Sequence, residues 1–460
     1  MGLYNGLKRR EHPPVRGGIS LGIKVAKFGG SSLADAGHFQ KVRDIVTSDP
    51  DICFVVPSAP GKRFKEDTKV TDMLYQCHRL VERNQSHEEL FQKIIDRYMG
   101  IYRELGLDFD FYGLLLHTGD EIRRQKNPDF AASRGEYLNG ILLSKYLGWD
   151  FVDAQDVIKF DRQGTFAAEW TNEVLGQTLK NHSRAVIPGF YGSYPNGDVH
   201  TFSRGGSDIS GAIVARAVGA DVYQNWTDVS GFLMADPNIV DNPKCIRELS
   251  YRELRELSYM GATVLHEDAI FPVHKAGIPT NIRNTNDPSD PGTMIVPQIS
   301  KDRNPGQRIT GIAGHKNFTL ITIDKAMMNS EYGFGRRVLQ ALEDFGVSFE
   351  HMPTGIDTMS VVVSDRELVT RKEQIIQRIE QLCQPDTISV STGIALIATV
   401  GHGMVSTPGS AATLFNALYE AGVNVKMIDQ GSSEFNIIVG VHVDDFETAM
   451  RAIYKAFVKE

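Results

Sequence analysis

The sequence predicts a large α/β domain with a largely parallel sheet, followed by a duplicated α+β module. Strand-like and helix-like segments alternate from residue 22, with strands expected at 22–28, 52–61, 183–193 and 220–232 and helices at 34–48 and 207–219. Stretches rich in Pro, Gly and Asp at 286–292 and 301–307 are typical of a domain boundary. Beyond them, two segments that begin at Leu320 and Leu396 resemble each other.

Length and composition restrict the class of protein. A chain of 460 residues suggests about three domains at roughly 150 residues each. The 49 Lys and Arg residues against 57 Asp and Glu residues give a net charge of −8, which offers no general attraction to nucleic acid or to a membrane surface. We therefore expect small-molecule chemistry without a nucleic-acid or membrane partner.

The cysteines and the terminus favour a cytoplasmic location. The four cysteines contain no CxxC pair, which excludes the usual disulfide frameworks and zinc sites and fits a reducing compartment. No segment approaches the roughly 18 consecutive apolar residues of a membrane span. Residues 1–21 contain Pro and Gly pairs without periodicity, so we expect a flexible tail.

The internal repeat has a consistent element order. Gly333 corresponds to Gly409 and Gly346 to Gly422. Each copy predicts a strand, a loop, a helix that ends at a glycine, a strand, a turn, a strand and a charged helix. The tripeptide 344–346 has the letters DFG of a protein-kinase metal motif, but without an HRD loop it is expected to end the helix of the first copy.

The first candidate site is the segment KFGGSS at 27–32. No GxxxxGK[ST] or strand-following GxGxxG is present, so a phosphate site must be built in another way. Lys27 ends a predicted strand, and Gly29, Gly30 and Ser31 open a predicted helix. An ammonium, bare N–H groups and a helix dipole then favour an anion. The alternative is a glycine pair that only makes a tight turn.

The second candidate site is SRGGSD at 203–208, again at a predicted helix start. Gly205 and Gly206 permit close backbone approach, and Arg204 has the fork that clamps a carboxylate or phosphate. Asp208 has the charge to orient Lys27 or to hold a metal. The alternative is a helix cap beside a surface arginine.

These motifs, together with RGE (134–136), NWTDVSGF (225–232), ADP (235–237) and GATVLH (261–266), resemble aspartate kinase of the amino-acid kinase superfamily. The repeat resembles its tandem ACT domains. The resemblance implies a three-layer α/β sandwich with a largely parallel central sheet, then two ferredoxin-like ACT domains. We expect the kinase domain at 22–297, a linker at 298–316, and ACT domains at 317–391 and 392–460, the first completed by the C-terminal segment in an alternative arrangement. The short run after the second repeat leads us to expect a monofunctional enzyme.

The family transfers the γ-phosphoryl group of ATP to the β-carboxylate of L-aspartate, with Mg²⁺ held mainly by the nucleotide and no separate protein metal site. An ionised carboxylate needs no general base for this reaction. By resemblance, Lys27 and Asp208 are catalytic, and Lys27 also contacts phosphate. The implied ATP contacts are Lys27, Gly29, Gly30, Ser31, Gly205, Gly206, Thr227, Asp228 and Asp236, and the implied aspartate contacts are Ser58, Thr71, Glu136 and Arg204.

Three positions depart from a common family pattern. Leu233, Asn238 and Thr263 stand where other members have Tyr, Arg and Lys. All three belong to the nucleotide side, so the contacts to base and ribose are open. His266, Glu267 and His274 lack the HExxH spacing, and a capping or packing role is expected for them rather than a metal site.

The ACT resemblance implies feedback control, with lysine preferred over threonine as effector. The implied effector contacts are Met328, Ser330, Gly333, Phe334, Gly335, Phe349, Glu350 and Thr354, and pairing of ACT sheets implies a homodimer or homotetramer. Two alternatives stay open: another amino-acid kinase, or an inactive ACT sensor. The RGE and SRGGSD pair with tandem ACT repeats argues against the first, and the joint presence of Lys27, Glu136, Arg204 and Asp208 argues against the second.

Overall fold

The computed structural model describes residues 22–203, 205–262, 265, 267–299, 308–405 and 407–458, so the expected tail of residues 1–21 lies outside it. The chain forms two compact units. The first comprises the described part of Met1–Phe202 with Ile213–Gln224, and the second comprises Ser203–Ala212 with the described part of Asn225–Glu460. The domain boundaries expected from the sequence stay a prediction.

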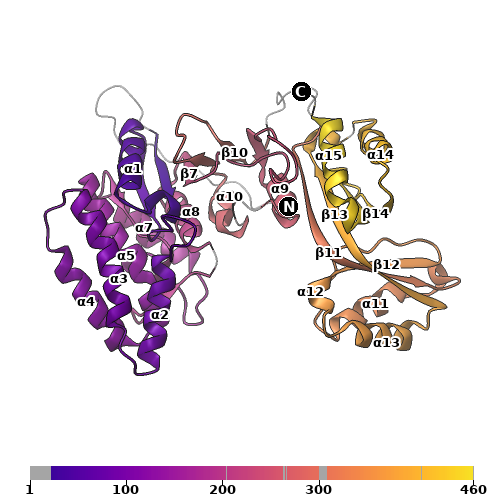
Figure 1. Ribbon diagram of the computed structural model, residues 1–460, viewed down its shortest axis with the longest axis horizontal. Coiled ribbons are helices and arrows are strands. Elements are labelled where there is room, and N and C mark those ends of the chain that lie inside the picture. The colour runs from indigo at the N-terminus through magenta and orange to yellow at the C-terminus, as the bar shows by residue number, and fades with distance from the viewer. Residues whose placement is uncertain are drawn as a thin grey trace, which may run out of the picture. The chain divides into compact units, whose positions relative to one another are not determined.

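The first unit contains the helix-rich half of the α/β domain (Figure 1). Its elements are β1 (Lys24–Phe28), η1 (Gly30–Leu33), α1 (Ala36–Ser48), β2 (Ile52–Pro57), α2 (Val70–Glu82), α3 (Glu88–Glu104), α4 (Phe111–Gln125), α5 (Pro128–Leu147), β3 (Asp150–Phe151), α6 (Ala154–Val157), α7 (Ala168–Leu179), β4 (Ala185–Val186), β5 (Tyr191–Ser193) and β6 (Val199–Thr201). The chain passes between the units within α8 (Gly206–Val218) and within β7 (Val222–Thr227).

The sheet of the α/β domain is largely parallel, as the alternation of strands and helices predicted. Its order is β3-β4-β2-β1-β7 in the first unit and β7-β9-β10-β8 in the second, with β7 shared. The β1–β2, β2–β4 and β3–β4 pairs are parallel. Val25, Ala26 and Phe28 of β1 are fully buried, which is typical of a strand covered on both faces.

Helices α2, α3, α4 and α5 lie side by side (Figure 1). Helix α5 begins at a strong sequence signal, because the Asn127 side chain accepts hydrogen bonds from the N–H groups of Asp129 and Phe130, and Pro128 occupies the first turn. The helix ends at Gly148 with φ +68°. These caps fix the ends of the helix that carries the RGE motif.

The second unit contains the remaining strands and the repeat. Its elements are β8 (Glu248–Ser250), α9 (Tyr251–Tyr259), η2 (Glu267–Ile270), α10 (Phe271–Ala276), β9 (Thr280–Asn284), β10 (Thr293–Val296), β11 (Gly311–Asp324), η3 (Met328–Ser330), α11 (Phe334–Glu343), β12 (Thr358–Ser364), α12 (Asp365–Leu368), α13 (Lys372–Cys383), β13 (Thr387–Val400), η4 (His402–Met404), α14 (Ser410–Glu420), β14 (Val425–Asp429), β15 (Asn436–His442), η5 (Val443–Asp445) and α15 (Phe446–Phe457).

Both copies of the repeat contribute to one five-stranded sheet, ordered β12-β11-β13-β15-β14. Strands β11 and β13 each have 14 residues and pair antiparallel along their length. The first half of β11, Gly311–His315, lies opposite Leu396–Val400, whereas its second half pairs with Thr387–Ile394. The expected boundary at residue 391 therefore falls inside β13.

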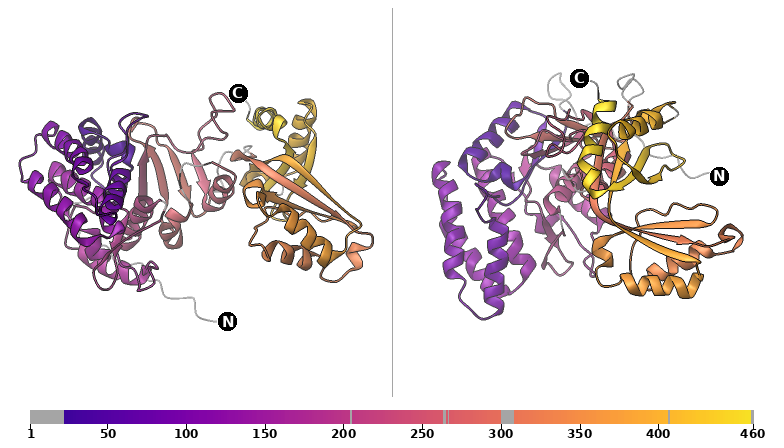
Figure 2. Two further views of the ribbon diagram at one scale, coloured as in Figure 1. Left: turned by 60° about the horizontal axis from the view of Figure 1, so that its bottom comes forward. Right: turned by 45° about the vertical axis from the view of Figure 1, so that its right-hand side comes forward.

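The helices of the repeat pack in pairs, α11 with α13 and α14 with α15 (Figures 1 and 2). The first copy has its own core, built from Ile321 and Ile323 of β11, Val338 of α11 and Ile375 and Ile379 of α13. As expected, 344–346 ends a helix, because Asp344 caps α11 and Gly346 adopts φ +62°.

One repeat element differs from expectation. Both copies were predicted to have a strand after their first helix, and the second copy has β14 there. In the first copy the corresponding segment makes only isolated bridges, between His351 and Val362 and between Thr354 and Met359. Pro353 and Gly355 explain this, because neither supports a regular ladder in a strand interior.

Helix α9 joins the end of the α/β domain to the repeat within the second unit. Its N-terminus has a capping box between Ser250 and the fully buried Glu253. The Glu253 carboxylate also accepts hydrogen bonds from the Thr310 hydroxyl and from the N–H group of His402. Glu256 accepts a 2.7 Å bond from the Asn436 amide. These contacts fix α9 against the sheet of the repeat.

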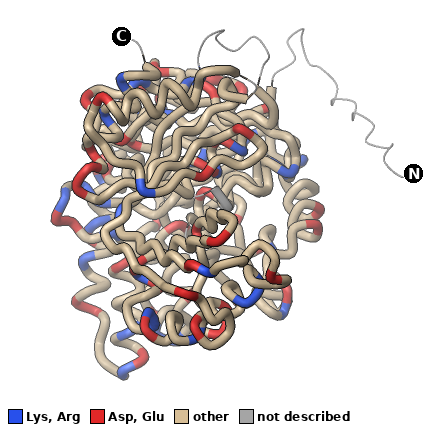
Figure 3. The backbone as a smooth tube through the Cα atoms, turned by 90° about the vertical axis from the view of Figure 1, so that its right-hand side faces the viewer, with Lys and Arg blue, Asp and Glu red and all other residues tan. Residues whose placement is uncertain are grey.

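Acidic and basic residues are interspersed along the backbone (Figure 3). Among the described residues, no helix combines the length and the apolar character that crossing a membrane requires.

Candidate functional site

The first candidate loop lies at the carboxyl end of β1. Lys27 is 7 % exposed and lies opposite Val56 of the parallel strand β2. Gly29 is extended, and its carbonyl accepts the N–H group of Ser32 at 3.0 Å, which closes the turn into η1. A Cβ on Gly30 would lie 2.8 Å from the Ala59 carbonyl oxygen, so only glycine fits there.

The long helix expected at 34–48 is present as α1, but the glycines do not open it directly. They open the four-residue η1, and α1 begins at Ala36. Asp35 caps α1 by accepting the N–H group of His38 at 3.0 Å. Asp35 therefore compensates the dipole of the long helix, which leaves Lys27 and the backbone N–H groups as the features of this loop that favour an anion.

Three of the four residues expected on the aspartate side, Ser58, Thr71 and Glu136, lie in the first unit. The Asn139 amide of α5 donates to the Ser58 carbonyl at 2.6 Å, which fixes the loop after β2. A Cβ on Gly135 would lie 2.8 Å from Cβ of Ala59 and 3.7 Å from the Thr71 hydroxyl oxygen. The segments that carry Ser58 and Thr71 thus pack against the part of α5 that carries Glu136.

Glu136 is a buried charge, 5 % exposed. Burial, with a contribution from this charge, raises the pKa of the Tyr98 phenol well above its usual value. Burial, with contributions from Asp129 and Glu136, also raises the pKa of Tyr75. A buried carboxylate on this helix is suited to hold an ammonium group.

The other charged residue of the RGE motif, Arg134, is buried against three aromatic rings. Its guanidinium carbon lies 4.4 Å from the ring centroid of Phe130, 4.3 Å from that of Tyr137 and 5.4 Å from that of Tyr191. The guanidinium also donates to the Ser133 hydroxyl. Arg134 is therefore held by aromatic faces through cation–π attraction.

The second candidate loop does open a helix, as predicted. Gly205 adopts φ +72°, and its carbonyl accepts the N–H groups of Asp208 and Ile209 at the start of α8. The Asp208 carboxylate accepts a 2.8 Å bond from the amide of the buried Asn225 on β7. Arg204 lies outside the described residues. Asp208 is thus oriented by a residue that sequence reasoning did not select.

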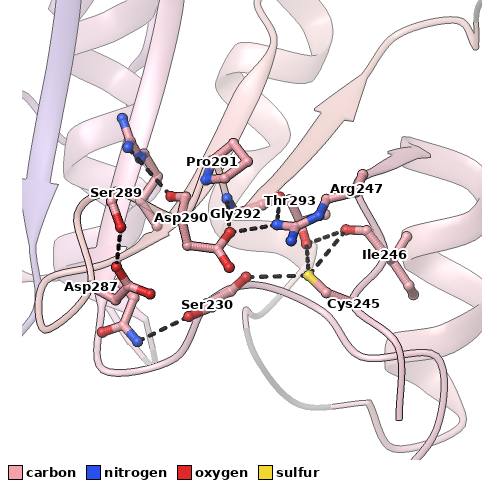
Figure 4. A network of polar contacts seen from close by, with 12 residues as sticks. Ser230, Cys245, Ile246, Arg247, Asp287, Ser289, Asp290, Pro291, Gly292 and Thr293 are labelled. Carbon is pink, nitrogen blue, oxygen red and sulfur yellow. Dashed lines mark hydrogen bonds and ion pairs between the residues drawn. The ribbon is translucent and has the colours of Figure 1, made fainter.

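The loop at 228–236 follows β7 and is anchored by a polar network (Figure 4). The fully buried Thr293 hydroxyl accepts the N–H group of Phe232 at 2.8 Å and donates to the Ile246 carbonyl at 2.5 Å. The Asn284 amide donates to the Ser230 hydroxyl at 3.0 Å, and the Cys245 thiol donates to the Ser230 carbonyl at 3.4 Å. Burial raises the pKa of this thiol.

The expected nucleotide residues occupy both ends of this loop. The Thr227 hydroxyl donates to the Asp228 carboxylate at 3.1 Å. Asp236 accepts bonds from the backbone and side-chain nitrogens of Asn238, at 2.8 and 2.9 Å. Asn238, one of the three departures, therefore stabilises the turn that presents Asp236. The backbone of Leu233 forms an isolated antiparallel β-bridge with that of Cys245, and Thr263 lies outside the described residues.

Metal-ligand clusters are absent from the described part of the chain, where no group of three or more His, Cys, Asp or Glu side chains has a suitable arrangement. His274 stacks on Tyr251 with ring centroids 4.1 Å apart, which fits the packing role expected for it. His266 and the side chain of Glu267 lie outside the described residues.

The expected effector residues divide into two groups. Met328 and Phe334 are each 3 % exposed and belong to the core of the first copy, so their side chains stabilise the module. Ser330, Gly333, Gly335, Phe349 and Thr354 are exposed or half-buried. Glu350 accepts a hydrogen bond from the Tyr259 hydroxyl of α9. Burial and the Glu350 charge raise the pKa of Tyr259 to about 12.

Residues 22–284 match the amino acid kinase family, and residues 397–457 match the ACT domain. Aspartokinase 3 of Bacillus subtilis is 42 % identical over 95 % of this chain and 98 % of its own length. The chain belongs to the aspartate kinase family.

Solved structures agree with this membership. The aspartate kinase of Clostridium acetobutylicum is 52 % identical and matches with a TM-score of 0.87, covering 95 % of this chain and all of that one. Aspartokinase III of Escherichia coli in complex with lysine and aspartate is 25 % identical, with a TM-score of 0.71 over 95 % of this chain and 100 % of that one. The resemblance seen in the motifs is confirmed, and the chain is an aspartate kinase with the expected fold.

The sequence did not point to two residues that hold candidate site segments in place by hydrogen bonds, Asn225 and Thr293. Asn225 lies inside the quoted motif but was passed over because its partner, Asp208, is 17 residues away. Thr293 follows Pro291 and Gly292 in what reads as a domain boundary, whereas its hydroxyl bonds to Phe232, 61 residues away. Only the three-dimensional pairing shows these roles.

Replacing Thr293 by Val tests the anchoring of the 228–236 loop. Thr293→Val keeps the volume but leaves the Phe232 N–H group without its acceptor, so the unfolding free energy should fall by about 1–3 kcal/mol. Urea unfolding measures the change, and hydrogen exchange should accelerate at Phe232. Thr293→Ser keeps the hydroxyl and should retain protection of that amide; equal exchange in both variants would contradict the anchoring role.

Proposed function

We propose that this aspartate kinase transfers the γ-phosphoryl group of ATP to the β-carboxylate of L-aspartate with the residues identified above. The observation that carries the proposal is a buried lysine, Lys27, near the carboxyl end of a parallel strand and three residues before Gly30, where the backbone of the neighbouring loop leaves no room for a side chain. Parallel strands of α/β sheets bind ligands at this end.

The proposed reaction requires little acid–base chemistry. A carboxylate oxygen of aspartate forms a bond to the γ-phosphorus, and the bond from that phosphorus to the bridging oxygen of ADP breaks. The nucleophile is already ionised, so no proton is removed. The protein must place the two substrates and compensate the charge on the phosphoryl oxygens.

We assign the donor side as follows. Lys27 stabilises the transferred phosphoryl group, and backbone N–H groups of Gly29, Gly30, Ser31, Gly205 and Gly206 bind phosphates. Mg²⁺, held mainly by the nucleotide, supplies further charge compensation when bound. Asp208 is suited to a place beside Mg²⁺, because carboxylate oxygen is a preferred ligand and Asn225 fixes its orientation. Thr227, Asp228 and Asp236 contact the rest of the nucleotide.

On the acceptor side we assign Glu136 to the α-ammonium of aspartate and Arg204 to its α-carboxylate, with Ser58 and Thr71 at the remaining polar groups. The buried position of Glu136 supports its role, since a desolvated carboxylate forms a stronger charge-assisted bond. The cytoplasmic location expected from the sequence stays a prediction.

Replacing Lys27 tests the catalytic assignment. Lys27→Met should lower kcat by about 10²–10³-fold or more, because one preorganised cation at the transferring phosphoryl is lost. The measurement is aspartate-dependent acyl phosphate formation with MgATP.

Lys24 provides a matched control on the same strand. Its ammonium contacts Asp49 at 2.9 Å and Asp51 at 3.2 Å. Lys24→Met should affect stability and leave turnover near the wild-type value. Wild-type turnover by Lys27→Met would overturn the assignment.

We further propose that lysine regulates the enzyme through the first copy of the repeat. The Escherichia coli enzyme has been crystallised with lysine and aspartate. In this chain Glu350 supplies a carboxylate for an effector ammonium, together with the loop that contains Ser330, Gly333 and Gly335. Glu350 also contacts Tyr259 of α9, so an ammonium would compete with the tyrosine hydroxyl. This competition connects the effector loop to α9.

Substitution of Glu350 tests this connection. Glu350→Gln should raise the lysine concentration for half-maximal inhibition by about 10-fold or more, because a charge-assisted bond is lost. Tyr259→Phe keeps the carboxylate and removes its competitor, so lysine should inhibit this variant at an equal or lower concentration. Lysine inhibition that is unchanged in Glu350→Gln would refute the proposed effector site.

We also propose that the repeat pairs two chains into a homodimer, from which a homotetramer can form. Large apolar side chains are exposed on the repeat, among them Met327, Tyr332, Ile356, Val369 and Tyr419. Exposed apolar groups of this kind are typical of an association surface.

Light scattering tests the association. We expect a mass of two or four chains at micromolar concentration, and Tyr332→Lys should shift it toward one chain. A strictly monomeric wild-type protein with feedback inhibition intact would rule out the dimer proposal.

A further inference from the structure

Arg97 of α3 is a buried cation with acceptors on three separate segments. Its side chain is 5 % exposed. One terminal nitrogen, Nη1, donates to the Asp67 carboxylate at 2.6 Å, and the other, Nη2, donates to the carbonyls of Ala34 at 2.8 Å and Gly61 at 2.6 Å. A planar guanidinium holds such partners in fixed relative directions.

Two of these acceptors belong to the loops that the proposed function uses. Ala34 ends the phosphate loop, which we define as residues 29–34. Gly61 belongs to the acceptor loop, which we define as residues 58–68 and which contains Ser58 and leads to Thr71. A single nitrogen of Arg97 therefore bonds to both loops.

The two loops are in direct backbone contact at this point. The Gly61 N–H group donates to the Gly30 carbonyl at 2.8 Å. A Cβ on Gly61 would lie 2.5 Å from the carbonyl carbon of Gly30, so the two backbones approach as closely as sterics permit. Any shift of one loop must displace the other or break this contact.

The third acceptor fixes the far end of the acceptor loop. The Asp67 carboxylate accepts a hydrogen bond from Arg97 on its buried side. On its exposed side it accepts one from Nε of Arg63 at 2.8 Å. Its carboxylate also accepts the N–H group of Thr68 at 3.0 Å. Arg63 and Arg97 hold the pKa of Asp67 well below its usual range, so the carboxylate stays ionised throughout the neutral range.

Stability alone accounts poorly for this arrangement. A buried charge is costly to desolvate, and apolar residues of similar volume often replace a buried ion pair without loss of stability. Nε of Arg97 also has no hydrogen-bond partner among the described residues. What the guanidinium provides is a fixed relation between Ala34, Gly61 and Asp67.

We propose that Arg97 is a positioning residue that fixes the offset between the phosphate loop and the acceptor loop, and thereby the distance from the transferred phosphoryl group to the aspartate carboxylate. The inference rests on the proposed aspartate kinase reaction. Arg97 touches neither substrate and acts through the two loops.

The reaction is sensitive to this distance. Reacting atoms must be brought to about 3–3.5 Å, and a displacement of about 1 Å can cost on the order of 10²-fold in rate. A displaced carboxylate also leaves room for water, whose oxygen then bonds to the γ-phosphorus while ADP leaves, giving phosphate and a proton. Loss of Arg97 should therefore lower transfer to aspartate and increase the share of ATP that is hydrolysed.

The experiment compares acyl phosphate, trapped with hydroxylamine, with total ADP release. In Arg97→Gln, kcat for acyl phosphate should fall by about 10- to 100-fold, while ADP release should fall less, so that the ratio of ADP to acyl phosphate rises. KM for ATP should change little, because the phosphate contacts remain. Arg63→Gln is the matched control, since it removes the exposed partner of Asp67 and leaves both carbonyl bonds; its ratio should stay at the wild-type value.

A second variant covers the case in which Arg97→Gln does not fold. Arg97→Lys keeps the charge but cannot reach three diverging acceptors, so it should show the same change of ratio with a smaller loss of kcat. A wild-type ratio and kcat in a folded Arg97 variant would overturn the proposal, as would a fall of both products in equal proportion. An unchanged ratio together with an inactive Lys27→Met would reject the positioning role and leave the kinase assignment intact.

Discussion

The backbone contact between Gly30 and Gly61 sets the geometry of the first unit's candidate site. These two segments follow adjacent parallel strands, β1 and β2, and the absence of side chains lets the loops meet directly. Lys27 lies at the end of one strand and Ser58 just beyond the other. The donor and acceptor groups of the proposed reaction thus derive their spacing from the interstrand distance, which hydrogen bonding holds at about 4.8 Å.

The second unit depends in a similar way on one buried carboxylate. Glu253 caps its own helix and binds Thr310 and His402, which precede and follow the two long strands of the repeat. Through the same helix, Tyr259 reaches Glu350. Because a fully buried carboxylate tolerates little displacement without losing its partners, α9 and the repeat behave as a continuous body. The effector proposed at Glu350 would therefore act on a helix whose other end is held by the contacts of Glu253.

Much of the fold was predictable because it depends on local patterns. The parallel strands are continuous apolar runs, the second glycine loop opens a helix, and the repeat is visible as aligned glycines. The failures occurred where nearby residues compete: Asp35 caps α1 and so separates this helix from the glycine loop, and Pro353 with Gly355 interrupts a strand. Arg97 could not be found from the sequence, because its acceptors Asp67, Ala34 and Gly61 lie 30, 63 and 36 residues away and follow no periodicity.

The divided pairing of β11 has a consequence for how the chain is synthesised. Its first half emerges from the ribosome before the whole of the first copy, yet its partner in β13 emerges only after that copy is complete. Until then the strand has an open edge, and open edges recruit other chains. A truncation between the copies would leave the same edge exposed permanently. The length of β11 therefore carries a risk of aggregation during translation, and this risk ends only when β13 and β15 have been synthesised.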